Sequence, residues 1–201
     1  MDHISESELR DVVQKVMAKI IDINSQQSAA AQPLSSFNEA ASPTCTSAKS
    51  RTIAVGSDHG GYELKSSLIA FLEELGHRVI DCGTNSKESV DYPDFAFAVA
   101  DEVRQAHACR GIVIDGAGIG SCMAANKVPG IRAAMCYDYA SAVNSREHNN
   151  ANVLTLGAGL LGINQVKLIV KTWLDTDFGG GRHTPRIDKI TAIERRFSKE
   201  G

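Results

Sequence analysis

The 201-residue sequence has no uninterrupted apolar stretch of the length, about 18 residues or more, that a membrane-spanning helix needs. Its start also lacks the basic segment and short apolar run of a secretory signal. No charge of one sign dominates, because 21 Lys and Arg face 24 Asp and Glu, for a formal net charge of −3. This balance gives no electrostatic reason to expect binding to nucleic acid or to a membrane.

Cysteine is scarce and shows no CxxC spacing, which is the pattern of zinc sites and of redox motifs. The five residues are Cys45, Cys82, Cys109, Cys122 and Cys136. An odd number without a regular framework is typical of a reduced, cytosolic protein with free thiols. We therefore expect a cytoplasmic protein that needs neither a metal ion nor another cofactor.

Three zones divide the chain. Across residues 1–24, apolar side chains recur at steps of three and four, which predicts an amphipathic helix. Residues 25–50 are rich in Ser, Ala, Gln, Pro and Thr without periodicity, which is typical of a flexible linker. Residues 51–201 alternate between strand-like and helix-like patterns, so we expect them to form the functional domain.

The alternation in the third zone predicts an α/β fold, a Rossmann-like three-layer sandwich with a five-stranded parallel sheet. Strands are predicted at Thr52–Gly56, Arg78–Asp81, Gly111–Ile114, Ile131–Cys136 and Val153–Leu156. Helices are predicted at Tyr62–Leu75, Phe95–Gln105, Ser121–Val128, Tyr139–Glu147, Leu161–Leu174 and Pro185–Phe197. Ligands of such sheets bind beyond the carboxyl ends of the strands, so the polar residues of the connections are the candidates for a site.

The most informative connection is the turn Asp115-Gly116-Ala117-Gly118-Ile119-Gly120, which lies between an apolar strand and a helix. This arrangement places backbone N–H groups where they can hold an anion. The turn lacks the Lys-Ser/Thr of a P-loop and the GxGxxG spacing of a dinucleotide site, so its glycines do not favour a nucleotide. A carboxylate beside an anion cradle indicates proton transfer with stabilisation of an oxyanion.

Other polar residues accompany this turn. Asp58 and His59 follow the first strand, Tyr92 lies beyond the second, and His148 ends a helix. Arg182, His183 and Arg186 form a basic cluster after three glycines. We expect most of these groups to gather at one edge of the sheet. Taken singly, each has a structural alternative: a helix cap for Asp58 and His59, a surface helix end for His148, and a solvated turn for the basic cluster.

Several separated motifs together resemble the B-type ribose-5-phosphate isomerases, a family that includes the galactose-6-phosphate isomerase subunits. The motifs are Ser57-Asp58-His59-Gly60-Gly61, Asp91-Tyr92-Pro93, Gly116–Gly120 with Ala124-Ala125-Asn126-Lys127, Arg146–Leu154 and Gly180-Gly181-Arg182-His183. They span about Thr52 to Arg196. The resemblance implies a homodimer with shared active sites, with assembly into tetramers left open. It implies metal-free aldose–ketose isomerisation of ribose 5-phosphate through an enediolate, an intramolecular oxidoreductase reaction.

The resemblance also implies roles for individual residues. His148 opens the sugar ring, and the N–H groups of the glycine turn face the enediolate oxygen. Arg182 and Arg186 hold the phosphate with His183 beside them, which suits a dianion. Further substrate-binding positions are Asp58, His59, Tyr92, Gly116, Gly118, Ile119, Gly120 and Asn149.

The sequence departs from the family pattern at the base. Many members have a cysteine where Asp115 stands, and another branch has a glutamate at the place of Ser121. The threonine common in the family is Ala117 here. We interpret Asp115 as the catalytic base, with a pKa that a dry pocket would raise. The alternatives are an isomerase of another sugar phosphate, such as a tetrose or hexose phosphate, and a sugar-phosphate-binding protein without catalysis.

The extension before the domain resembles the encapsulation peptides that load enzymes into bacterial microcompartments. An amphipathic helix on a long linker suits docking to a partner surface, so residues 5–24 are the candidate contact with a shell protein. This interpretation places the protein inside a microcompartment of the cytoplasm. The alternative is a helix that packs on its own domain or pairs with itself.

Overall fold

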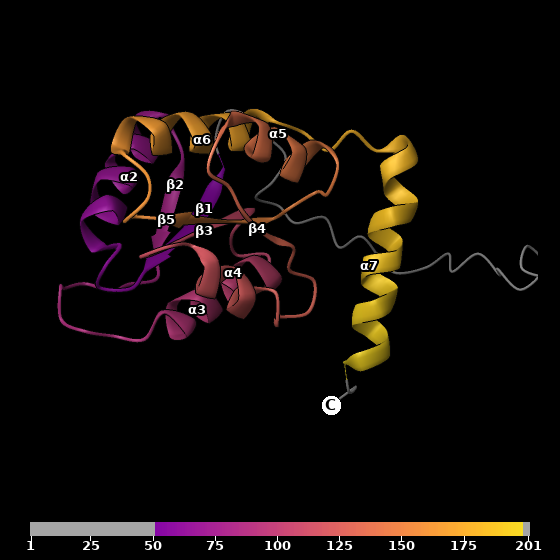
Figure 1. Ribbon diagram of the computed structural model, residues 1–201, viewed down its shortest axis with the longest axis horizontal. Helices are drawn as coiled ribbons and strands as arrows, with labels where there is room; N and C mark the ends of the chain where they lie inside the picture. The colour runs from indigo at the N-terminus through magenta and orange to yellow at the C-terminus, as the bar shows by residue number, and fades with distance from the viewer. Residues whose placement is uncertain (1–50, 199–201) are drawn as a thin grey trace, which may run out of the picture. The chain divides into compact units, whose positions relative to one another are not determined.

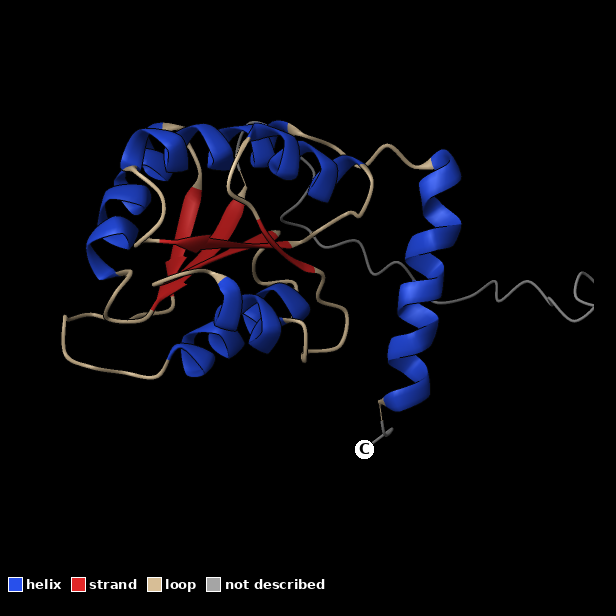
Figure 2. Cartoon of the chain, in the orientation of Figure 1, coloured by secondary structure: helices blue, strands red, loops and turns tan. Residues whose placement is uncertain are grey.

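The computed structural model describes residues 51–198, and the helix and linker predicted before Arg51 lie outside this range. The predicted five-stranded sheet is confirmed: all strands are parallel, in the order β2-β1-β3-β5-β4 (Figures 1 and 2). The strands are β1 (Thr52–Ser57), β2 (Arg78–Asp81), β3 (Arg110–Asp115), β4 (Ala133–Met135) and β5 (Val153–Gly157). The chain therefore has the Rossmann-like α/β architecture that the alternation predicts.

Helices cover both faces of the sheet, as the three-layer prediction requires. They are α2 (Tyr62–Glu74), α3 (Tyr92–Arg104), α4 (Ile119–Ala125), α5 (Tyr139–Glu147), α6 (Ile163–Asp175) and α7 (Thr184–Phe197), with a short 3₁₀ turn at Gly181–His183. One apolar core lies under α2, α5 and α6, and a second lies under α3 and α4 (Figure 1). No helix of residues 51–198 is long and apolar enough to span a bilayer.

The apolar sequence runs of the central strands β1, β3 and β5 are explained by their burial. Every residue of β1 and β5, and all of β3 after Arg110, is buried, because each of these strands is covered on both faces. The edge strand β4 is shorter than the sequence predicts. The Arg132 N–H donates 2.7 Å to the side-chain oxygen of Asn152, and regular pairing begins one residue later at Ala133.

The register fixes which chain segments meet. Asp115 pairs with Gly157 and Ser57 pairs with Ile114, so the loops after β1, β3 and β5 share the carboxyl edge of the sheet. The helices run back in the opposite direction, as parallel topology demands. The last turns of α5 and α6 therefore lie at the amino edge.

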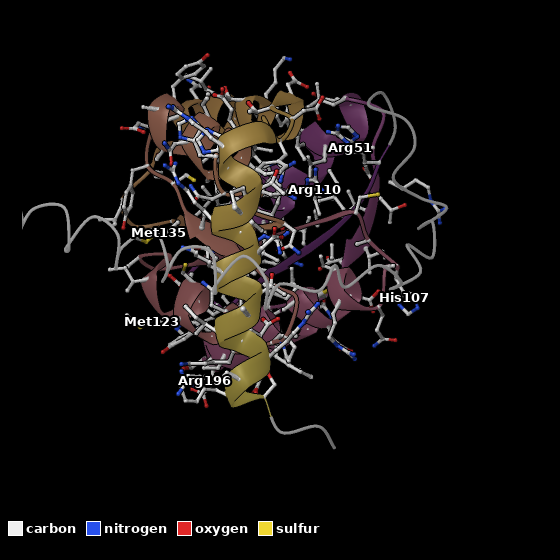
Figure 3. The ribbon with its side chains drawn as sticks, turned by 90° about the vertical axis from the view of Figure 1, so that its right-hand side faces the viewer. Arg51, His107, Arg110, Met123, Met135 and Arg196 are labelled. Atoms are coloured by element: carbon white, nitrogen blue, oxygen red, sulfur yellow. The ribbon has the colours of Figure 1, made fainter. Side chains whose placement is uncertain are left out.

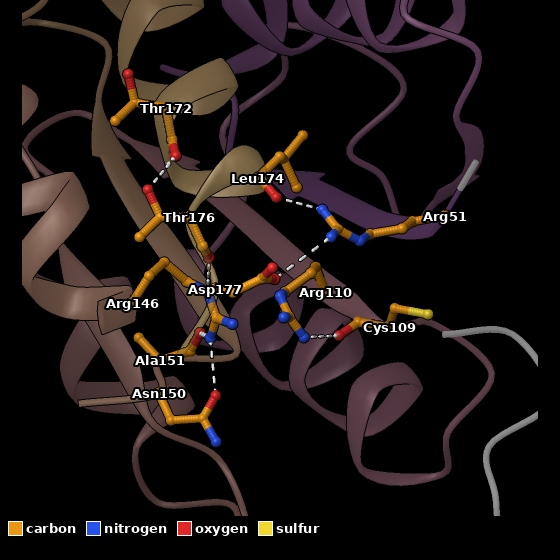
Figure 4. Close-up of polar contacts among 10 residues, drawn as sticks. All are labelled: Arg51, Cys109, Arg110, Arg146, Asn150, Ala151, Thr172, Leu174, Thr176 and Asp177. Carbon is orange, nitrogen blue, oxygen red and sulfur yellow. Dashed lines mark hydrogen bonds and ion pairs between the residues drawn. The ribbon is translucent and has the colours of Figure 1, made fainter. Parts of the chain in front are cut away.

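At this amino edge, Arg51 and Arg110 (Figure 3) lie with Arg146 near the end of α6 (Figure 4). Arg110 and Arg146 also lie over the ring of Trp173. Arg146 donates 3.2 Å from Nε to the Thr176 carbonyl, and Arg51 donates to the Leu174 carbonyl. These bonds pair carbonyls that a helix C-terminus leaves without intrahelical partners. Burial, followed by the charge of neighbouring arginines, lowers the pKa of Arg110 to about 10 and that of Arg146 to about 9.

Of the four cysteines in residues 51–198, three are the free thiols that the sequence predicts. Cys82, Cys122 and Cys136 are free thiols, whereas Cys109 takes part in a disulfide. Burial raises the pKa of the Cys82 thiol to about 11. Since thiol reactivity depends on the thiolate, this side chain is inert at neutral pH.

Candidate active site

Asp115 is the last residue of β3, and its side chain points back into the turn that follows. Only 4% of the residue is exposed. The carboxylate accepts hydrogen bonds from the N–H groups of Ala117 at 2.8 Å and Ser121 at 3.0 Å, and from the Ser121 hydroxyl at 2.5 Å. The Gly118 N–H is a fourth donor. Asp115 is thus held on both carboxylate oxygens.

These donors decide the charge of Asp115. Burial acts to raise the pKa, but the hydrogen bonds from Ser121, Gly118 and Ala117 outweigh it and lower the pKa below its usual value. The raised pKa that we expected for Asp115 in a dry pocket is therefore wrong. Water barely reaches the carboxyl group, but four hydrogen-bond donors surround it. Asp115 is an ionised carboxylate at neutral pH.

The anion held by the turn is consequently the chain's own side chain. Gly118 has φ +79°, a conformation that favours glycine, and it directs the turn's N–H groups onto Asp115. The first-turn N–H groups of Ile119 and Gly120 belong to positions that a helix leaves without intrahelical acceptors. These N–H groups are therefore able to donate to an oxygen atom bound at the turn.

The loop after β1 lies against this turn. The Asp58 N–H donates 3.2 Å to the Ile114 carbonyl, and Asp58 Oδ1 accepts from the Gly61 N–H at 3.0 Å. Gly61 is the N-cap residue of α2, which has no side-chain cap hydrogen bond, so the Asp58 contact stabilises the turn before the helix and does not cap the helix itself. His59 is exposed, and its Nδ1 lies 3.2 Å from both the nitrogen and the oxygen of Val90.

Tyr92, the first residue of α3, lies over the glycine turn. A Cβ placed on Gly120 would come 2.5 Å from the Tyr92 ring, so the ring occupies the space that a side chain at Gly120 would fill. The structure therefore brings together one set of predicted residues, which we call the carboxyl-edge group. It consists of Asp58, His59, Tyr92, Asp115 and Gly116–Gly120.

The remaining predicted residues form a second set at the amino edge of the sheet, the amino-edge group. It consists of His148, Asn149, Arg182, His183 and Arg186. The imidazole rings of His148 and His183 stack with centroids 4.1 Å apart and planes 10° apart. The Gly179 N–H donates 2.9 Å to the Glu147 carbonyl and fixes the glycine-rich loop to the end of α5.

The expectation that most of these residues share one edge is therefore wrong for the amino-edge group. His148 follows α5, and the loop of Arg182 follows α6, so both lie where returning helices end. The strand β5 connects the two edges, and the four steps from Val153 to Gly157 cover about 13 Å. Within one chain the two groups are separate.

The amino-edge group is strongly positive. Arg182 and Arg186 are exposed, whereas His183 is buried. Burial, followed by the electrostatic influence of the neighbouring His148, Arg182 and Arg186 side chains, lowers the pKa of His183. A phosphate dianion is the natural partner of such a cluster. Among residues 51–198, no three His, Cys, Asp or Glu side chains are grouped so that they could hold a metal ion.

Sequence reasoning missed two residues of these groups. Ser121 is fully buried and gives Asp115 two of its four hydrogen bonds. The amide nitrogen of Asn144 lies 2.9 Å from Nδ1 of His148. Its position four residues before His148 places both on one face of α5, which is the signal that could have revealed it.

Comparison with known proteins adds to this geometry. Residues 53–190 match the family described as Ribose/Galactose Isomerase. The chain is 47% identical over 146 residues to ribose-5-phosphate isomerase B of Escherichia coli (strain K12), covering 73% of this chain and 98% of that one. It is 40% identical over 146 residues to D-erythrulose-4-phosphate isomerase of Pectobacterium atrosepticum, covering 72% and 96%. The solved structure of ribose-5-phosphate isomerase B from Clostridium thermocellum has a TM-score of 0.72 and 52% identity, covering 73% and 99%.

Proposed function

Because the chain belongs to the ribose/galactose isomerase family, a family of sugar-phosphate isomerases, we propose that it interconverts ribose 5-phosphate and ribulose 5-phosphate. Residues 51–201 form the isomerase domain in this proposal. The observation that carries it is the pairing of an ionised, buried carboxylate at the carboxyl edge with a cationic cluster at the amino edge. A proton-transfer group and a phosphate-binding group are what aldose–ketose isomerisation of a sugar phosphate requires.

The reaction follows from these parts. With His148 at the ring oxygen, the C1–O4 bond breaks and C1 becomes an aldehyde. Asp115 removes the proton from C2, and the electrons of that C–H bond form an enediolate. The N–H groups of Ile119 and Gly120 face the enediolate oxygen. The proton of the C2 hydroxyl then moves to O1, C2=O2 forms, and return of the proton from Asp115 to C1 gives the ketose, while Arg182 and Arg186 hold the phosphate.

Asp115 is the proposed base, and its hydrogen bonds have two effects. They keep the carboxylate ionised and fixed, which favours proton abstraction, and they weaken it as a base by the same free energy that lowers its pKa. The test is loss of deuterium exchange at C2 of ribose 5-phosphate in Asp115→Asn, with Asp115→Cys as the matched variant. Exchange at the wild-type rate in folded Asp115→Asn would exclude Asp115 as the base.

We propose that the complete site needs a second copy of the chain. The two groups are separate within one chain, and an apolar groove of about 1100 Å³ lies between α7 and the body of the domain. The groove is lined by Ile131, Met135, Ile190, Ile193 and Phe197, among others. Of these, Ile193 is 61% exposed and Phe197 is 77% exposed. Exposed apolar side chains grouped in this way are typical of a protein–protein interface.

Subunit complementation tests this arrangement. Asp115→Asn removes the base, and Arg182→Gln removes a phosphate ligand, so each variant alone should be inactive. Co-refolded mixtures should regain activity, because a mixed dimer contains one site with both native residues. Failure to regain activity in a mixture shown to contain mixed dimers would exclude a shared site.

A tetrose phosphate is the second candidate substrate. The relative named D-erythrulose-4-phosphate isomerase is 40% identical to this chain. In the proposed site, Asp115 and Ala117 would face the first carbons of the substrate. Assay of four-, five- and six-carbon aldose phosphates distinguishes these substrates. Binding of all of them without turnover would instead indicate a sugar-phosphate-binding protein.

We also propose that residues 5–24 dock to a shell protein, so that the enzyme is cargo of a cytoplasmic bacterial microcompartment. The amphipathic pattern and the following linker support this proposal. Deletion of residues 1–24 should abolish co-localisation with shell proteins and leave isomerase activity intact. Unchanged co-localisation would contradict the proposal.

A further inference from the structure

Three side chains at the end of α5 form a hydrogen-bonded chain that leads to His148. Asn144 and His148 are one helical turn apart, so their side chains meet on the same face. Asn149 Nδ2 lies 3.2 Å from the Asn144 backbone oxygen and 3.1 Å from the Asn144 Oδ1. Asn144 Nδ2 lies 2.9 Å from Nδ1 of His148.

The backbone carbonyl at one end fixes the direction of every bond in this chain. A carbonyl oxygen only accepts, so the Asn149 atom beside it is the NH₂ nitrogen. The same NH₂ contacts Asn144, whose atom there must be the amide oxygen. The other end of the Asn144 amide is then its NH₂, and it donates to Nδ1 of His148. Since Nδ1 accepts, the ring carries its proton on Nε2.

We propose that Asn144 is a positioning residue that holds His148 as the neutral imidazole with its proton on Nε2. This inference rests on the ring-opening role proposed for His148. A doubly protonated ring would point a second N–H at the NH₂ of Asn144, which also donates.

The neutral ring defines how the sugar ring opens. As the C1–O4 bond breaks, its electron pair goes to O4, which receives a hydrogen bond from Nε2–H. The proton of the anomeric hydroxyl leaves to water, C1=O1 forms, and O4 takes a proton from water. The imidazole therefore ends the step in the form in which it began, as an electrophilic donor and not as a proton carrier.

Nitrogen NMR of the histidine rings tests the protonation state directly, without any need for turnover. In the full-length wild type at neutral pH, His148 should show an unprotonated Nδ1 and a protonated Nε2. In Asn144→Asp, a carboxylate of nearly the same shape should draw the proton to Nδ1. The ring of His107, which contacts Glu102 on another helix, should keep its signals in both proteins. A wild-type His148 with its proton on Nδ1, or on both nitrogens, would overturn the proposal.

A second measurement separates positioning from a general structural role. Ribulose 5-phosphate has no ring, because its C5 oxygen carries the phosphate, so exchange of its C1 hydrogens with D₂O needs no ring opening. Asn144→Asp should lower kcat/KM for ribose 5-phosphate by about 100-fold, the lower end of general acid–base contributions. The same variant should leave the C1 exchange rate of ribulose 5-phosphate within about two-fold of wild type, since the groups that act in proton transfer at carbon are unaltered.

Asn144→Leu removes the donor without adding charge. It should lower kcat/KM for ribose 5-phosphate less than Asn144→Asp does, and it should also leave the C1 exchange rate of ribulose 5-phosphate unchanged. Equal loss of both rates in the two variants would reduce Asn144 to a structural residue and overturn the proposal. Absence of turnover in the wild type would contradict the proposed function instead, while the NMR result would still decide the protonation of His148.

Discussion

At the scale of single residues, Asp115 shows how a turn can fix the charge of a side chain. Four donors converge on a carboxylate that water barely reaches, so its ionised form is favoured in the folded protein. The sequence predicts a carboxylate beside the turn, but not that the turn's N–H groups point at it. That direction depends on backbone angles, above all the positive φ of Gly118, which a residue pattern does not contain.

The lowered pKa of Asp115 predicts a pH-dependent contribution to stability. Because the folded pKa lies below the unfolded one, the contribution is complete above the unfolded value of about 3.9 and is lost as pH falls through the folded pKa. Asp115→Asn should therefore lower the free energy of unfolding at pH 7 by about 2 kcal/mol. Urea denaturation of both proteins should show this difference shrinking below about pH 4. A constant difference would contradict the assignment.

Two glycines of the same turn provide a matched pair. A Cβ on Gly118 would lie 2.9 Å from the Leu156 carbonyl carbon at a positive φ, whereas a Cβ on Gly116 would meet nothing within 4 Å. Gly118→Ala should cost about 3 kcal/mol of stability through strain and overlap. Gly116→Ala should change it by less than about 0.5 kcal/mol. Thermal or urea unfolding measures both, and equal effects would show that the turn relaxes freely.

At the scale of elements, the sequence predicts every strand and helix of residues 51–198 that forms the sandwich, in the correct order. Helix starts differ most: α3 begins at Tyr92 and not at Phe95, because Pro93 is tolerated in a first turn. The start of β4 could not be predicted, since it depends on the hydrogen bond that the Arg132 N–H donates to the side chain of Asn152, just before the neighbouring strand β5. The buried arginines were also missed, because charged residues near strand starts and helix ends look like surface positions.

Arg146 shows what such a residue contributes. It is 2% exposed and donates to the carbonyls of Thr176 and Ala151, so its removal leaves buried acceptors without partners. Arg146→Met should lower stability by about 3 kcal/mol, measured by chemical denaturation. Arg104→Met provides the control, since Arg104 pairs with Asp101 on an exposed helix face and should cost less than about 1 kcal/mol. Similar losses in the two variants would contradict a specific role for Arg146.

At the scale of the whole molecule, the separation of the two groups follows from topology. The residues after β1 and β3 belong to the carboxyl edge, whereas His148 and Arg182 follow helices that return to the amino edge. The order of elements in the sequence contains this information. The misplacement arose because a polar residue after a helix was grouped with polar residues after strands.

The exposed face of α7 predicts the oligomeric state. Ile193 lines the groove beside α7, and the Glu194 carboxylate accepts 2.9 Å from the Gly130 N–H on the body of the domain. Ile193→Asp should convert the proposed dimer to monomers and abolish activity, as measured by light scattering and assay. Leu168→Asp is the matched control, because Leu168 is 55% exposed on α6 outside the groove. Monomers with full activity would exclude a site shared between copies.

The carboxylate held in the glycine turn also determines how the protein responds to its ionic surroundings. A turn already filled by its own negative charge repels sulfate, inorganic phosphate and other buffer anions. Such ions should therefore compete only at Arg182 and Arg186, raising the apparent KM for a phosphorylated sugar without slowing the chemical step. If Asp115 and the arginines have the roles proposed above, the resident carboxylate keeps these salts away from the proton-transfer end of the site and leaves the two arginines as the place where they compete with the substrate.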